Sequence, residues 1–179
     1  MLVPRQPVPS LRVPLVGGST FDLANESPEF ATMLVFYRGL YCPICATYLK
    51  ELERLTPEFN DKGVTTLALS SDDADRAEEF ATKIRADNLR VGHSLSLSNA
   101  KEWGLYISEG RGTTSIGIEE PAKFSEPGLF LIKPDGTLYY GNVQTMPFAR
   151  PDFKPLLGAL DFVKANNYPA RGEYTGSVA

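Results

Sequence analysis

Residues 33–45 of the chain read Met33-Leu34-Val35-Phe36-Tyr37-Arg38-Gly39-Leu40-Tyr41-Cys42-Pro43-Ile44-Cys45. The first five residues are a continuous apolar run, which is typical of a strand buried on both faces of a sheet. Pro43 suits the first turn of a helix, where a missing N–H does no harm. We therefore predict a central strand at 33–37 and a helix that begins near Cys42. Unpaired backbone N–H groups and the positive end of the helix dipole favour thiolate there, the reactive form of cysteine.

The predicted helix carries apolar residues at spacings of three or four, namely Cys45, Tyr48, Leu52, Leu55 and Phe59. This spacing is typical of an amphipathic helix with one buried face. We therefore expect Cys45 to point inward and Cys42 to lie at the exposed tip of the helix.

Strands and helices alternate along the middle of the chain. We predict strands at 64–69 and 89–93, with a helix between them that is capped by Ser71-Asp72-Asp73. This order implies parallel pairing through right-handed crossovers. A short helix through Ala100 and Trp103 follows. The apolar run 129–132 and the run 137–140 flank a turn at 133–136, which predicts a β-hairpin, and a last amphipathic helix spans 153–163.

Three segments have weaker patterns. The first residues contain several prolines and form an extension, with Gly17-Gly18 predicting a hairpin turn. Residues 108–127 show no sustained period, and a stretch of that length is usually functional or mobile. The tail from residue 166 has no pattern and is expected to be loosely held.

The composition narrows the class of protein. The 179 residues, 42% of them hydrophobic, suffice for one domain with a single core, and a net charge of −4 argues against nucleic acid as a partner. The N-terminus lacks the apolar stretch of a signal peptide and no run is long enough to span a membrane, so we expect a cytoplasmic location. In a reducing compartment, a close cysteine pair is more often catalytic, redox-active or metal-binding than a structural staple.

Metal and nucleotide sites are not predicted. His93 is the sole histidine, and two cysteines with one distant histidine make a poor zinc set. The segment Gly110-Arg111-Gly112 lacks the spacing and the lysine of a phosphate-binding loop. We therefore expect neither a metal nor another cofactor.

The strand, the Cys-x-x-Cys and the later Pro127-Gly128-Leu129-Phe130-Leu131-Ile132 together resemble the thioredoxin fold, and more closely the peroxiredoxin-like redoxins of the alkyl hydroperoxide reductase and thiol-specific antioxidant (AhpC/TSA) family. The resemblance covers about residues 11–163 of the single predicted domain, 1–179. It implies an α/β fold with a central mixed sheet, helices on both faces, an N-terminal extension and a C-terminal helix. It also implies that Pro127 is a cis proline packed against the disulfide, an isomer found in only about 5–6% of X–Pro bonds.

The chain departs from the peroxiredoxin pattern Pro-x-x-x-Thr-x-x-Cys. When the last position is laid on Cys45, Arg38 replaces the proline and Cys42 replaces the threonine. The family also uses an arginine before the third core strand, where this chain has Ser125-Glu126-Pro127. Arg111 and Arg150 are the candidates to replace that arginine.

The pattern leaves open which sulfur attacks. As a thioredoxin-type pair, Cys42 is the nucleophile and Cys45 the resolving thiol, and the cycle ends in a Cys42–Cys45 disulfide that an external thiol must reduce. Arg38 either adds positive charge beside the thiolate or is a structural cation. Tyr41 is either an aromatic rim for a partner or, as we favour, part of the packing.

The leading hypothesis is a thiol-dependent oxidoreductase of peroxiredoxin-like type that reduces peroxides or disulfides and is recycled by a thioredoxin- or glutathione-type reductant. The alternatives are a disulfide oxidoreductase without peroxidase activity, a non-catalytic interaction module and a redox sensor. Exposed sheet edges and related folds allow a homodimer.

Overall fold

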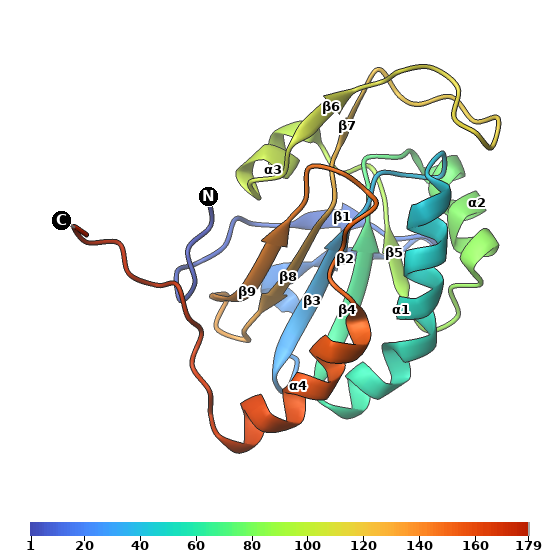
Figure 1. The fold of residues 1–179 in the computed structure, drawn as a ribbon. Coiled ribbons are helices and arrows are strands. Elements are labelled where there is room, and N and C mark those ends of the chain that lie inside the picture. Colours follow the sequence, from blue (N-terminus) through green and yellow to red (C-terminus); the bar gives the residue numbers. More distant parts are fainter. Residues whose placement is uncertain (179) are drawn as a thin grey trace.

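A mixed sheet forms the centre of the fold in this computed structural model, which describes residues 1–178 (Figure 1). Within those residues the sheet has five strands in the order β5-β4-β3-β8-β9. Their bounds are Arg90–Gly92, Val64–Leu69, Ala31–Phe36, Gly128–Ile132 and Leu138–Val143, respectively. β4 pairs in parallel with both β3 and β5, whereas β8 is antiparallel to β3 and β9. The first predicted strand is therefore central, and the predicted parallel pairing and hairpin are confirmed.

Side chains of the sheet alternate between two apolar clusters, one on each face. On the first face, Met33 and Val35 pack with helices α1 (Pro43–Asp61), α2 (Ala74–Ile84) and α4 (Phe153–Ala165). On the second face, Leu34 and Phe36 pack with the short helix α3 (Leu97–Glu102) and with the N-terminal hairpin. The continuous apolar run of β3 thus serves two cores, because successive strand residues point to opposite faces. The expected α/β fold with helices on both faces is confirmed.

The N-terminal extension covers much of the second face. It forms β1 (Arg12–Pro14) and β2 (Thr20–Asp22), which pair antiparallel across the predicted glycine turn, followed by a 3-10 turn at Leu23–Asn25. Phe21 is 2% exposed because it packs into the cluster beneath the sheet. The predicted hairpin is confirmed.

Two predictions about irregular segments were wrong. Residues 108–127 are not structureless: β6 (Ile107–Glu109) pairs antiparallel with β7 (Lys123–Ser125) in an arm above the sheet (Figure 1). The tail after α4 is attached as far as Ala170, which is buried and accepts a hydrogen bond from Arg5 at 2.9 Å, whereas most of residues 171–178 are exposed. The β6–β7 pairing and the contact between Arg5 and Ala170 each join residues that are not neighbours in the sequence, so a local periodicity of apolar residues cannot predict them.

The helix caps follow from the sequence. Asp73 caps α2 by accepting the N–H of Arg76 at 2.9 Å, and the Cys42 sulfur takes the same role for α1. Of the helices in residues 1–178, none combines the length and the apolar character needed to cross a membrane.

Candidate active site

Cys42 lies where β3 has passed through a short loop into α1. It is the N-cap of that helix, and its Sγ accepts the backbone N–H of Cys45 at 3.3 Å. The loop is held by Asp72, whose carboxylate accepts the N–H of Leu40 at 2.7 Å. Gly39 makes this contact possible, because at φ +150° an added Cβ would lie 2.7 Å from both Asp72 oxygens. The loop therefore places Cys42 at the positive end of α1.

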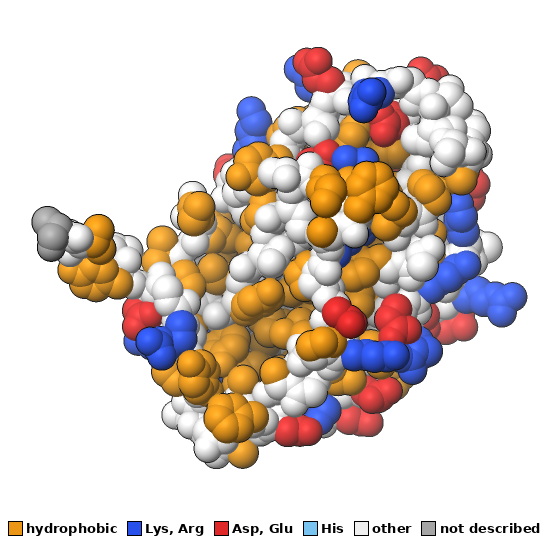
Figure 2. Space-filling view, in the orientation of Figure 1, with side chains coloured by type: hydrophobic (Ala, Val, Ile, Leu, Met, Phe, Trp, Pro, Cys, Tyr) orange, Lys and Arg blue, Asp and Glu red, His pale blue; other side chains and the backbone are white. Residues whose placement is uncertain are grey.

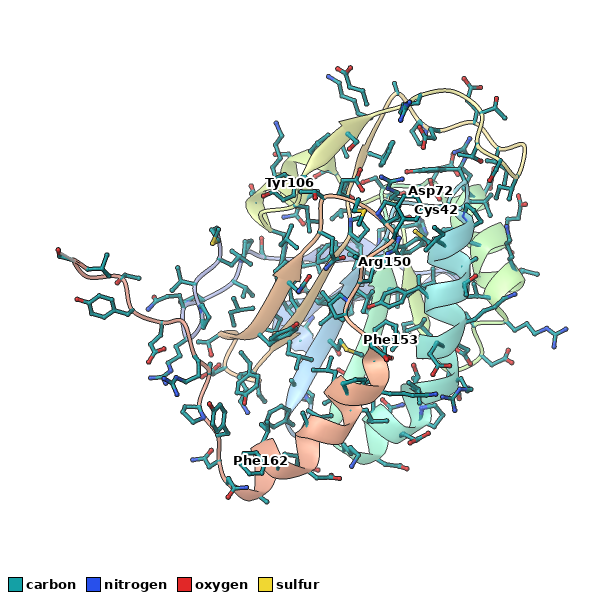
Figure 3. All side chains as sticks on the ribbon, in the orientation of Figure 1. Cys42, Asp72, Tyr106, Arg150, Phe153 and Phe162 are labelled. Atoms are coloured by element: carbon teal, nitrogen blue, oxygen red, sulfur yellow. The ribbon has the colours of Figure 1, made fainter. Side chains whose placement is uncertain are left out.

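Arg150 reaches the two sulfurs from the segment between β9 and α4. Its Nη2 lies 3.0 Å from the Cys45 Sγ and 3.8 Å from the Cys42 Sγ. Figure 3 shows the labelled Cys42 and Arg150 side chains meeting at the upper end of α1. The guanidinium lies 5.1 Å from the centre of the Tyr48 ring, and Tyr48 donates its hydroxyl hydrogen to the Pro151 carbonyl at 2.6 Å. The segment that carries the cation is thus fastened to α1.

The pKa values of the two thiols are shifted in opposite directions. Hydrogen bonds from the Cys45 thiol and backbone N–H, together with the charges of Arg150 and Arg38, lower the pKa of Cys42 to about 6 despite burial. Burial and the neighbouring Cys42 raise the pKa of Cys45 well above its ordinary value. Both cysteines are free thiols. At neutral pH, the geometry therefore supplies one thiolate, on Cys42, beside one neutral thiol, on Cys45.

Arg38 is paired with Glu126 rather than with the sulfurs. Its Nε and Nη2 donate to the two carboxylate oxygens at 2.7 and 2.8 Å. The Glu126 carboxylate also accepts the Ser108 hydroxyl at 2.6 Å, and Glu126 is only 2% exposed. This network joins the loop before Cys42 to the β6–β7 arm. The charge of Arg38 still lowers the pKa of Cys42, but by less than the charge of Arg150 does.

The structure corrects the expected exposure of Cys42. The cysteine is 5% exposed and Cys45 is fully buried, so Cys42 does not lie at an exposed tip. The helical period distinguishes the two faces of α1, but the segment carrying Arg150 covers the start of the helix from outside it. Cys45 faces inward as predicted.

The expected cis proline is also absent. No peptide bond among residues 1–178 is cis, so the bond before Pro127 is trans. Pro127 does directly precede β8, but the chain runs from β7 into β8 without the tight turn in which cis prolines typically occur. Its carbonyl accepts the N–H of Gln144 at 3.0 Å.

The structure distinguishes Arg150 from Arg111, the two candidates to replace the arginine of the family pattern. Arg150 contacts the sulfurs, whereas Arg111 is exposed in the loop between β6 and β7. Tyr41 is fully buried and donates its hydroxyl hydrogen to the Arg38 carbonyl at 2.8 Å, which is a packing role.

Apolar side chains gather on the surface of the segment between β9 and α4 (Figure 2), where Met146 and Phe148 are 46% and 74% exposed.

Sequence reasoning did not foresee two contacts of this site. It treated Asp72 as a helix cap and Glu126 only as the residue standing where the family has an arginine. Both are buried acids, at 3% and 2% exposure. A buried carboxylate needs a partner, but which partner it finds is decided by chain segments far apart in sequence. Among residues 1–178, no group of three or more histidine, cysteine or acidic side chains is arranged to hold a metal ion.

Comparisons with known proteins agree with this fold. The model of the AhpC/TSA family matches residues 4–141. The chain is 31% identical over 137 residues to a protein of Peptoclostridium acidaminophilum described as the selenocysteine-containing peroxiredoxin PrxU. The match covers 73% of this chain and 61% of that relative, so the chain spans less than two thirds of the relative's length.

Solved structures of low sequence identity share the fold. The peroxidoxin BcpB of Mycobacterium tuberculosis is 19% identical with a TM-score of 0.70, over 91% of this chain and 99% of that one. A mutant of peroxiredoxin 6 from Arenicola marina is 16% identical with a TM-score of 0.74, over 94% of this chain and 76% of that one. With a family model matching most of its length around a Cys-x-x-Cys site, this chain belongs to the AhpC/TSA family.

Proposed function

We propose that this chain is a thiol-dependent peroxidase in which Cys42 attacks a small peroxide and Cys45 resolves the product. The observation that carries the proposal is the Cys42 sulfur held between the Cys45 N–H and the Arg150 guanidinium, at 3.3 and 3.8 Å. Both groups stabilise negative charge on sulfur, and a thiolate is the form that attacks peroxide. Membership of the AhpC/TSA family supports the same chemistry.

The cycle balances with the groups present and an external thiol. The Cys42 thiolate attacks one peroxide oxygen, the O–O bond breaks, and the leaving oxygen takes up a proton as water or an alcohol. The Cys42 sulfenic acid is then attacked by the Cys45 sulfur, which forms the S–S bond and releases the hydroxyl as water. Two electrons from a thiol reductant of thioredoxin or glutathione type return the disulfide to two thiols.

Burial favours a small oxidant over a protein disulfide. Attack on a protein disulfide needs a sulfur that a second protein can reach, and Cys42 is 5% exposed. Hydrogen peroxide or a small alkyl hydroperoxide needs only a narrow approach. Burial also supports Cys42 as the attacking sulfur, because Cys45 is 0% exposed and burial raises the pKa of its thiol. We further propose that the chain is a single domain and that it works in the cytoplasm. In a reducing compartment, a close cysteine pair is more often catalytic than a structural disulfide.

The test is to map the first oxidised sulfur. The reduced protein is mixed with one equivalent of hydrogen peroxide in the presence of a sulfenic-acid trap, and the modified peptide is identified by mass spectrometry. We expect the Cys45→Ser variant to accumulate trapped sulfenic acid on Cys42, the wild type to form the Cys42–Cys45 disulfide, and Cys42→Ser to consume no peroxide. First oxidation at Cys45 would reverse the assigned roles.

A disulfide oxidoreductase without peroxidase activity is the second candidate. The specific observation in its favour is the Cys-x-x-Cys spacing, with a low-pKa first cysteine and a buried second one. The same experiment separates the two: this candidate predicts no trapped sulfenic acid on either cysteine but rapid reduction of a small disulfide substrate.

A further inference from the structure

Two arginines flank the cysteine pair, but they differ in how their charge is compensated. Arg38 donates two hydrogen bonds to the carboxylate of Glu126, at 2.7 and 2.8 Å. Arg150 donates to the sulfurs and to the Pro147 carbonyl, and no carboxylate among residues 1–178 forms an ion pair with it. The positive charge of Arg38 is therefore largely neutralised by its neighbour, whereas that of Arg150 remains available to a thiolate.

Glu126 is built into the structure rather than resting on the surface. It is 2% exposed, its N–H donates to the Tyr106 carbonyl at 2.8 Å, and its carboxylate also accepts the Ser108 hydroxyl. The Arg38 guanidinium lies 5.2 Å from the centre of the Phe124 ring. A bidentate pair held in this way has little freedom to rearrange, so Arg38 stays with Glu126 instead of turning toward Cys42.

The position of the pair is specific to this chain's departure from the family pattern. Arg38 occupies the place of the pattern's proline, and Glu126 lies in the short stretch before the third core strand where the pattern has an arginine. The chain thus has a cation in the loop before Cys42, and this cation is paired with an acid from the stretch before β8.

We propose that Glu126 is a positioning residue that neutralises Arg38 and thereby limits how strongly the loop before Cys42 stabilises the Cys42 thiolate. The inference rests on the proposed function only for the catalytic role of Cys42. The titratable and charged groups around this cysteine come from α1, from the loop before it and from the segments after β4, β7 and β9; they are Cys45, Arg38, Tyr41, Asp72, Glu126 and Arg150.

The experiment titrates Cys42 in three variants by its rate of iodoacetamide alkylation against pH, which needs no peroxide. Glu126→Gln should lower the pKa of Cys42 by about half a unit to one unit, a roughly three- to tenfold larger ionisation constant, because Arg38 is no longer neutralised. Arg38→Gln should raise the pKa, because a cation is lost. The double variant Arg38→Gln/Glu126→Gln should lie between them, near the wild type.

The two single variants are expected to shift the pKa of Cys42 in opposite directions, which separates electrostatic positioning from a merely structural role. If the pair only fastens the arm, both single variants loosen it and both move the pKa of Cys42 up toward its ordinary value. A pKa that is unchanged or raised in Glu126→Gln overturns the proposal. Should Glu126→Gln fail to fold, the comparison is between Arg38→Gln and the double variant: a lower pKa in the double variant supports the proposal, and an equal or higher one overturns it.

Glu26→Gln is the matched control. Glu26 accepts a bidentate pair of hydrogen bonds from Arg90 at 2.9 and 2.8 Å, so it loses the same kind of interaction outside the site. We expect it to leave the pKa of Cys42 unchanged. Failure of the peroxidase proposal would appear as absent peroxide consumption in all proteins, and would leave the alkylation titrations readable.

Discussion

Replacing Arg150 with glutamine should raise the pKa of Cys42. The guanidinium Nη2 lies 3.8 Å from the Cys42 Sγ, where two unit charges interact by about 4 kcal/mol at an effective dielectric constant of about 20. Arg150 is only half-buried, and the hydrogen bonds from Cys45 remain, so the net loss is nearer to about 1.4 kcal/mol, or about one pKa unit.

The effect is largest in a measurement near pH 6. With a pKa of about 6, about half of Cys42 is thiolate at that pH in the wild type, and about a tenth would be thiolate after a rise of one unit. The iodoacetamide alkylation rate at pH 6 should therefore fall about fivefold in Arg150→Gln, whereas at pH 9 the two proteins should react at similar rates. Mass spectrometry confirms that Cys42 is the modified residue.

Arg111→Gln is the matched control, since it removes the same charge from an exposed loop position. Its titration should coincide with that of the wild type. The reasoning would be refuted if Arg150→Gln kept the wild-type midpoint, or if both variants shifted equally, because the shift would then reflect net charge rather than the contact.

Two further predictions concern the scaffold. Gly39→Ala should destabilise the protein in urea denaturation by about 1–3 kcal/mol and slow Cys42 alkylation, because the added Cβ meets the Asp72 carboxylate and Tyr41 at a strained φ; wild-type stability would contradict the tight packing of this loop. Glu26→Gln should cost about 1 kcal/mol near pH 7. A hydrogen bond from Arg90 lowers the pKa of Glu26 from 4.5, so this difference should be complete above pH 4.5 and vanish as the pH falls through the lower folded-state value; a pH-independent difference would exclude the ion pair as its source.

The strands and the helix that surround the cysteines were predictable because their sequence signals are local. β3 lies in a continuous apolar run, Cys42 caps a helix with a proline in its first turn, and β4 occupies exactly the predicted residues Val64–Leu69. Each depends on neighbours within a few positions, where side-chain period and backbone capping act. The β6–β7 arm and the attached tail were not predictable in this way, because their partners lie far away in the chain.

Residues 33–45 alone contain both thiols, the strand that delivers them and the helix end that favours a thiolate, since these depend on covalent spacing and backbone geometry. Folding decides which charges surround the sulfurs. Arg150 lies 105 residues beyond Cys45 and Glu126 lies 88 beyond Arg38, and nothing in the local sequence pairs them. The hydrogen bonds from Cys45 that lower the pKa of Cys42 are local, whereas the burial of Cys42 and the contributions of Arg150 and Glu126-paired Arg38 are properties of the tertiary structure, because electrostatic interactions act through space.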